Sequence, residues 1–93
     1  MIASFRDKET ERLWRSGSSR HLPVEAHRRA FKKLAILNAA IRLENLRMPP
    51  GNRLEALHGG RAGQYSIRIN DQYRVCFVWQ DGNAFDVEVV DYH

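Results

Sequence analysis

The sequence predicts an α+β domain of two layers, in which helices cover one face of a small antiparallel sheet. Residues 23–45 carry apolar side chains at spacings of three and four, which is the period of an α-helix. Residues 65–90 alternate apolar and polar side chains, which is the period of a β-strand, and two turn-forming stretches divide them into three strands. Helices followed by antiparallel strands are typical of the α+β class.

The composition indicates one domain, residues 1–93. No apolar run approaches the roughly 20 residues that span a bilayer, and the first ten residues lack the apolar core of a signal peptide. The one cysteine, Cys76, excludes an intramolecular disulfide and fits a reducing compartment. We therefore expect a cytoplasmic protein without a membrane segment, in which Cys76 is a small buried side chain.

The charge is unevenly distributed along the chain. The net charge is +4, and all 15 Lys and Arg residues lie at or before Arg74, whereas four acidic residues follow it. A body this basic favours an anionic partner, either nucleic acid or an acidic protein. The alternative is a solvated basic surface without a partner.

The helical half follows a short predicted strand at residues 1–5. Residues 7–15 form a helix, because acidic residues near the beginning and arginines near the end suit the helix dipole, and Gly17 follows as a stop. Pro23 opens a long helix that extends to Asn45. Its apolar stripe consists of Phe31, Leu34, Leu37 and Ile41, widened by Val24, Ala30 and Ala35. Its other side carries Arg28, Arg29, Lys32 and Lys33, as a solvated face or as a contact surface for RNA phosphates or an acidic partner.

A proline pair ends the helical half, since residues 48–52 cannot continue a helix. Residues 53–57 are a short strand candidate. Residues 58–63 form a glycine-rich loop whose backbone can approach a ligand closely. The loop lacks the GxxxxGK spacing of a phosphate-binding nucleotide loop, so it does not indicate nucleotide binding, and we expect no cofactor.

The first hairpin of the sheet places two arginines side by side. Strands at residues 65–70 and 73–79 are joined by a short turn, and pairing Ile69 with Tyr73 puts Arg68 opposite Arg74. Like charges in that position destabilise a strand pair, so we expect a compensating group such as a bound phosphate.

The last strand, residues 85–90, follows a second turn at residues 80–83. Matching its apolar face to that of the preceding strand puts Arg74 opposite Val90. Residues 91–93 then emerge beside the arginines.

Metal-independent RNA cleavage needs the side chains that this arrangement gathers. A base must take the proton of a 2′-hydroxyl, an acid must protonate the 5′-oxygen, and cations must stabilise the charge on the phosphate. Histidine carries protons near neutral pH, and arginine binds phosphate oxygens in a planar, bidentate way. The candidates are His58, Arg61, Arg68, Arg74, Asp91, Tyr92 and His93, of which His93 has the alternative of a frayed end. No HExxH or CxxC motif is present, so we expect no metal.

Several segments resemble the HigB-type toxins of bacterial toxin–antitoxin modules, within the broader RelE-like group. They are MIxSF at residues 1–5, PPGNRLEAL at 49–57 with the glycine-rich loop after it, YSIRINDQYRVCF at 65–77 and VVDYH at 89–93. The last two together are specific, and the resemblance covers nearly the whole chain.

The resemblance implies a fold of two N-terminal helices packed on a small, mostly antiparallel sheet. It implies ribosome-dependent cleavage of mRNA in the A site, and a HigA-type helix-turn-helix antitoxin through which the complex binds operator DNA. The motifs match Arg74, Asp91, Tyr92 and His93 to active-site positions of the family, and His58 is matched by its place before the glycine-rich loop. Arg61 lies in that loop, and Arg68 is added from strand geometry.

Two other functions are compatible with these residues. One is a RelE-fold toxin that acts on a protein target such as gyrase, and the other is a non-catalytic regulatory binding module. The Asp-Tyr-His sequence at residues 91–93 favours the nuclease, because a protein that acts only by contact has less use for proton-carrying side chains.

Overall fold

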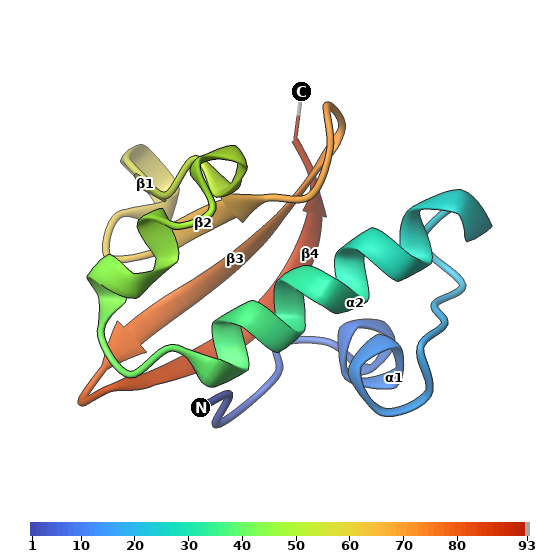
Figure 1. The fold of residues 1–93 in the computed structure, drawn as a ribbon, viewed down its shortest axis with the longest axis horizontal. Coiled ribbons are helices and arrows are strands. Elements are labelled where there is room, and N and C mark those ends of the chain that lie inside the picture. Colours follow the sequence, from blue (N-terminus) through green and yellow to red (C-terminus); the bar gives the residue numbers. More distant parts are fainter. Residues whose placement is uncertain (93) are drawn as a thin grey trace.

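The computed structural model describes residues 1–92, so that His93 lies outside the described part. Two helices, α1 (Lys8–Ser16) and α2 (Val24–Ala39), precede a four-stranded sheet and cover one of its faces (Figure 1). The strands are β1 (Glu55–Ala56), β2 (Tyr65–Arg68), β3 (Tyr73–Gln80) and β4 (Asn83–Asp91). Short 3-10 helices, η1 (Leu43–Arg47), η2 (Pro50–Asn52) and η3 (Gly59–Arg61), lie between α2 and β2. The predicted α+β class is confirmed.

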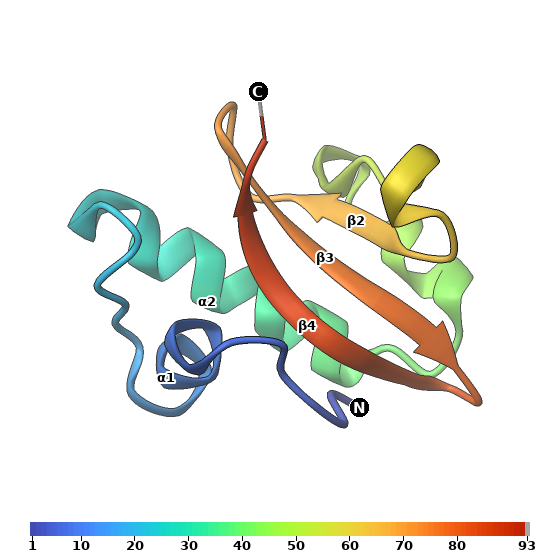
Figure 2. The same cartoon turned by 180° about the vertical axis from the view of Figure 1, so that it is seen from behind.

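The sheet has the order β1-β2-β3-β4, and each neighbouring pair is antiparallel. The N-terminal segment runs beside β4 and makes two isolated parallel bridges, Ile2 with Ala84 and Phe5 with Val87 (Figure 2). The predicted strand at residues 1–5 is therefore a pair of bridges, and it supplies the parallel part of a mostly antiparallel sheet.

Helix α1 begins and ends one residue later than predicted, and Gly17 ends it as expected. The Asp7 carboxylate accepts a hydrogen bond from the Thr10 amide at 3.2 Å, which satisfies one of the free N–H groups of the first turn. Gly17 adopts the left-handed conformation with φ of 81°, and its N–H donates to the Leu13 carbonyl at 2.8 Å.

Helix α2 is shorter than predicted, because it ends at Ala39 rather than at Asn45. The Asn45 Oδ1 atom accepts hydrogen bonds from the backbone N–H groups of Ile41 and Arg42, at 3.1 and 2.8 Å. This side chain offers the backbone partners that the next turn of α-helix would have supplied. The chain therefore leaves the helix at Ala40 in an extended conformation and starts the separate turn η1.

The buried stripe of α2 also differs from the predicted one. Leu34, Leu37 and Ala30 are buried as predicted, and Ala26 completes the stripe. In contrast, Val24 is 79% exposed, Ile41 78% and Phe31 39%. The alanines let the helix lie close to the sheet, whereas the ring of Phe31 stacks on Trp14 of α1 at a centroid distance of 5.3 Å.

The core lies between the helices and the sheet. Buried side chains of alternate strand positions meet Leu13, Leu34 and Leu37 of the helices; they are Ile67, Ile69, Val75, Phe77, Ala84 and Val87. The register confirms that Arg68 lies opposite Arg74 and that Arg74 lies opposite Val90. The pairing register of β3 with β4 changes between Cys76 and Val78, where the regular strand pairing is interrupted.

Asn52 holds the segment between α2 and the sheet in place through side-chain hydrogen bonds. It is fully buried, and its Nδ2 atom donates to the carbonyls of Leu46 and Met48 at 3.2 and 3.1 Å. Its Oδ1 atom accepts a hydrogen bond from Lys33 Nζ of α2 at 2.6 Å. Burial lowers the pKa of Lys33, and its basic neighbours Lys32, Arg29 and Arg68 lower it further.

We expect Asn52→Ala to lower the free energy of unfolding by about 2–3 kcal/mol, because buried groups lose their hydrogen-bond partner. Urea unfolding of the variant and the unchanged chain measures this difference. Asn83→Ala is the matched control, since Asn83 Nδ2 donates at 3.3 Å in an exposed hydrogen bond to the Asp81 carbonyl, and we expect a change within about 0.5 kcal/mol. Equal, small effects of both substitutions would contradict the assignment of Asn52 as an anchor.

Candidate active site

The candidate site lies on the face of the sheet turned away from α1 and α2, which is seen in front in Figure 2. Because successive strand residues point to opposite faces, the positions between the core residues project here. They include Ser66, Arg68, Arg74, Cys76 and Glu88, and we call this surface the distal face.

No helix of residues 1–92 is long and apolar enough to cross a bilayer.

Arg74 is the central residue of the distal face. The residue is only 7% exposed, and its Nε atom donates to Ser66 Oγ at 2.7 Å. The Nη2 atom donates to the carbonyls of Arg53 and Ser66, and Nη1 lies 3.7 Å from a Glu55 carboxylate oxygen. These partners hold the guanidinium in one position, as a charged group in an enclosed place requires.

Tyr92 covers the guanidinium of Arg74. The Arg74 Cζ atom lies 5.6 Å from the centre of the tyrosine ring, within the range of a cation–π interaction. The Tyr92 backbone N–H donates to the Gln72 carbonyl at 2.6 Å, and the side chain is 40% exposed. A phenol that solvent reaches is thus fixed against a buried cation.

The charge of Arg68, opposite Arg74, is balanced within the protein. Arg68 Nη2 forms an ion pair with Asp71 in the turn, while Glu55 faces Arg74. The like-charge pairing predicted from the sequence therefore exists, and a carboxylate lies against each of the two arginines. The Arg68 side chain remains 30% exposed.

Arg61 and His58 come from the glycine-rich loop. Arg61 Nη1 donates to Gln64 Oε1 at 3.0 Å and to Glu88 Oε2 at 3.2 Å, so that Arg61 leans over the distal face. His58 is exposed and directly precedes η3. Within residues 1–92, no hydrogen bond or ion pair joins its side chain to Arg68 or Arg74.

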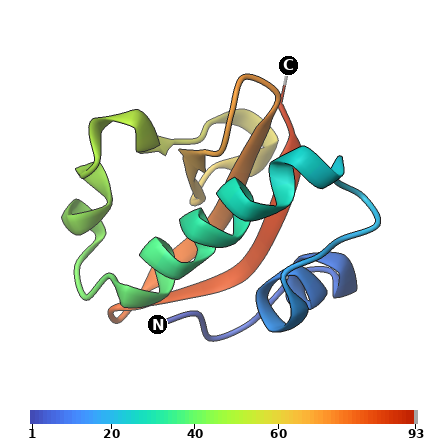
Figure 3. The same cartoon turned by 45° about the vertical axis from the view of Figure 1, so that its right-hand side comes forward.

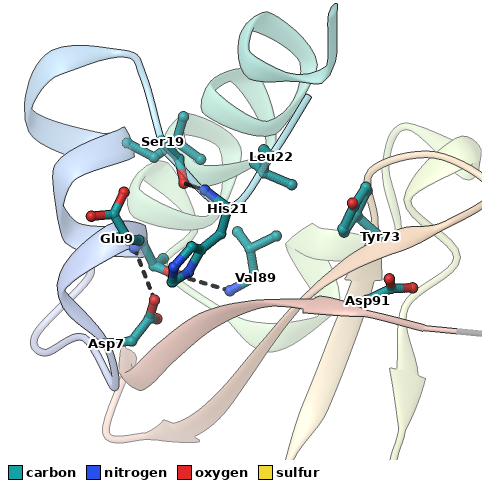
Figure 4. A pocket seen from close by; sticks show the side chains of 10 residues that line it. Asp7, Glu9, Ser19, His21, Leu22, Tyr73, Val89 and Asp91 are labelled. Atoms are coloured by element: carbon teal, nitrogen blue, oxygen red, sulfur yellow. Dashed lines mark hydrogen bonds between the residues drawn. The ribbon is translucent and has the colours of Figure 1, made fainter. Parts of the chain in front are cut away.

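Asp91 lies on the opposite side of the sheet from the Arg74 guanidinium. It pairs with Tyr73 across the strands and accepts a hydrogen bond from Gln72 Nε2 at 3.1 Å. With Tyr73 and Val89 it lines a cavity of about 180 Å³ against α1 and the segment that follows it (Figure 4). The structure therefore brings Arg68, Arg74 and Tyr92 together and separates Asp91 from them, and His93 lies outside the described residues.

Two partners of Arg74 were not singled out in the sequence. Ser66 could have been found, since strand alternation puts it on the same face as Arg68 and beside the neighbouring strand. Glu55 carried no such signal, because its approach to Arg74 depends on the course of the segment between η2 and β1.

Cys76 lies fully buried among these charged groups. Burial raises the pKa of its thiol, Glu88 acts in the same direction, and Arg61 and Arg74 act against it. A neutral, enclosed thiol is a poor nucleophile, so the predicted role as a small buried side chain is confirmed. In the part of the chain that the structure describes, no group of three or more His, Cys, Asp or Glu residues could hold a metal ion.

The chain matches a known class of protein. The family model of the RelE-like toxin HigB of type II toxin–antitoxin systems matches residues 3–93. The chain therefore belongs to the HigB-like toxin family, which confirms the resemblance found in the sequence. Because a type II toxin acts with a protein antitoxin, the chain has an antitoxin partner.

Individual relatives agree with the family. The chain is 42% identical to Toxin HigB-1 of Vibrio cholerae over 87 residues, which is 92% of each chain. It is 28% identical to Endoribonuclease HigB of Proteus vulgaris over the full length of both chains. An uncharacterized protein of Haemophilus influenzae is 32% identical over 81 residues, or 86% of this chain and 80% of that protein.

We expect Cys76 in the native protein to react with iodoacetamide at pH 8 roughly 10³-fold more slowly than in the unfolded chain, because unfolding must expose it first. Mass spectrometry of samples quenched over time, with and without urea, measures both rates. Native labelling as fast as that of the unfolded chain would contradict the burial and the raised pKa of the thiol.

Proposed function

We propose that this toxin is a ribosome-dependent endoribonuclease that cleaves mRNA in the ribosomal A site without a metal ion. The observation that carries the proposal is the contact of Tyr92 with the buried guanidinium of Arg74, beside Arg68. The name of the Proteus vulgaris relative, Endoribonuclease HigB, supports the endoribonuclease part of the proposal.

The reaction is an attack of an RNA 2′-oxygen on the adjacent phosphorus. The 2′-hydroxyl gives its proton to a base, the bond from phosphorus to the 5′-oxygen breaks, and an acid protonates that oxygen. The products are a 2′,3′-cyclic phosphate and a free 5′-hydroxyl. The protein must supply two proton-transfer groups and positive charge near the phosphate oxygens.

The positive charge comes from the arginines of the distal face. Arg68 is exposed enough to reach a phosphate and can exchange its ion pair with Asp71 for one with RNA. Arg74 is held by Ser66 and the Arg53 carbonyl before any substrate binds, so that no reorganisation is needed as charge develops. Arg61 extends the RNA-binding surface toward Glu88.

We assign the proton transfers to His58, Tyr92 and His93. Tyr92 is the member of this group that the structure places against Arg74. Asp91 acts by position, because its hydrogen bond with Gln72 and its pairing with Tyr73 hold the end of β4 where Tyr92 turns toward the guanidinium.

The proposed partners follow from this activity. The ribosome and its mRNA are the substrate complex, and a HigA-type helix-turn-helix antitoxin neutralises the toxin in the cytoplasm. Operator DNA is reached through the antitoxin. The net charge of +4 suits a toxin that must approach ribosomal RNA.

We expect Tyr92→Phe to lower mRNA cleavage by about 10²-fold or more, because the ring over Arg74 is kept and only the hydroxyl is lost. Mapping of new 5′ ends in cellular mRNA after brief induction measures cleavage, with and without a block of translation. Arg42→Ala is the control, since Arg42 is exposed and lies in the segment before η1. New ends inside codons that disappear when translation is blocked are expected for the unchanged chain and the control.

Other results would exclude this activity. Growth arrest without new mRNA ends, together with plasmid DNA linearised by gyrase, would establish the protein-target alternative. Harmless expression of the unchanged chain without its antitoxin would support the regulatory module.

We expect Arg74→Lys to fold and to lose about 10²-fold in cleavage, because an ammonium group retains the charge but not the fixed, planar donors. Arg74→Ala should also lower the free energy of unfolding by about 3 kcal/mol or more, since Glu55 and the Arg53 carbonyl lose a buried partner. Thermal unfolding and end mapping on the same variants separate the two effects. Full cleavage by Arg74→Lys would show that the fixed guanidinium has no part in the reaction.

A further inference from the structure

A groove runs between α1 and the first half of α2, which lie side by side in blue and cyan in Figure 3. It encloses about 590 Å³ and is lined by Trp14 and Arg15 of α1 and by Val24, His27, Arg28 and Phe31 of α2. It lies on the helix side of the molecule, whereas the distal face lies on the other side of the sheet (Figure 2).

The groove exposes apolar side chains that the fold does not need for its core. Val24 and Phe31 are separated by seven residues, so they lie on one side of α2, and this side differs from the buried stripe of Ala26, Ala30 and Leu34. The Phe31 and Trp14 rings stack with an interplanar angle of 26°, which gives the groove a rigid aromatic wall. Apolar anchors at this spacing are typical of a helix that binds a partner segment.

The charges around the groove select the partner. Arg28 and His27 stand on the α2 side, and Arg29 and Lys32 continue the basic surface next to Arg28. Arg15 is paired with Glu11 on α1, and Glu25 is the acidic neighbour of the α2 cluster. The net charge of these residues is positive, so the groove favours a segment that carries carboxylates beside its apolar side chains.

The apolar lining favours a protein over RNA as the occupant. RNA binding relies on basic groups that contact phosphates and on aromatic faces that are free to stack with bases. Here the ring of Phe31 already stacks on Trp14, and Val24 is aliphatic. The stacked rings and the aliphatic side chain suit the buried centre of a protein interface with a charged rim.

We infer that the groove between α1 and α2 binds an acidic, amphipathic segment of the antitoxin. Apolar side chains of the segment lie against Trp14, Val24 and Phe31, and its carboxylates face Arg28 and His27. The inference rests on membership of the toxin family and not on the proposed ribonuclease activity, which belongs to the other side of the sheet.

The test is calorimetric titration of the purified full-length toxin with its cognate antitoxin. Val24→Glu and Ile41→Glu form a matched pair, since the two side chains are 79% and 78% exposed and only Val24 lines the groove. Arg28→Glu and Arg47→Glu form a second pair, in which only Arg28 lines the groove. A glutamate at position 24 suits the first turn of α2, so the fold is expected to persist, and thermal unfolding checks it.

We expect Val24→Glu and Arg28→Glu to weaken binding by about 30-fold or more, and the two controls by less than about threefold. In cells, the groove variants should still arrest growth but should no longer be rescued by the antitoxin. Arg28→Glu should also reduce the loss of affinity with rising salt concentration.

Affinity of both groove variants within about threefold of the unchanged toxin would overturn the inference. Two further results would overturn it by naming another occupant. Weaker binding of a short single-stranded RNA by Val24→Glu, with unchanged antitoxin affinity, would make the groove an RNA surface. Loss of a toxin dimer in light scattering, with unchanged antitoxin affinity, would make it a contact between two copies.

Discussion

The burial of one cation, the guanidinium of Arg74, constrains the part of the chain that follows α2. Removing a charged group from water costs several kcal/mol unless partners replace the solvent. The partners here are Ser66 of β2, Glu55 of β1, the Arg53 carbonyl and the ring of Tyr92. They come from separate segments, so satisfying one guanidinium fixes where β1, the segment before it and the end of β4 lie relative to β3.

The strands were predictable because their period is short and their signal is repeated. Alternation over β2, β3 and β4 was enough to place Arg68 opposite Arg74 and Arg74 opposite Val90. The end of α2 was not predictable in the same way. Ile41 continues the helical spacing of apolar residues, but the Asn45 side chain binds the backbone N–H groups of Ile41 and Arg42 and ends the helix before them. Periodicity carries no information on such a local competition.

The candidate site also contains residues whose positions were predictable and residues whose positions were not. Arg74 and Tyr92 were predicted to meet, and they do. Asp91 was grouped with them through the VVDYH motif, yet neighbouring residues of an extended strand project from opposite faces. Extending the predicted last strand by one residue, to Asp91 as in β4, would have separated the two. The approach of Glu55 could not be predicted, since β1 has two residues and its position depends on tertiary contacts around Asn52 and Arg53.

Helix α2 packs against the sheet with one face and exposes apolar side chains on another. Small side chains at Ala26 and Ala30 let it lie close to the sheet, where a residue as large as Phe31 would hold the two layers apart. Phe31 and Val24 contributed to the apolar period from which the helix was predicted, but the packed core excludes them. Apolar groups left on the surface lower the solubility of a small domain unless another surface covers them. The stacking of Phe31 on Trp14, the exposure of Val24 and the basic residues around both are therefore better explained by a partner than by the stability of the toxin alone.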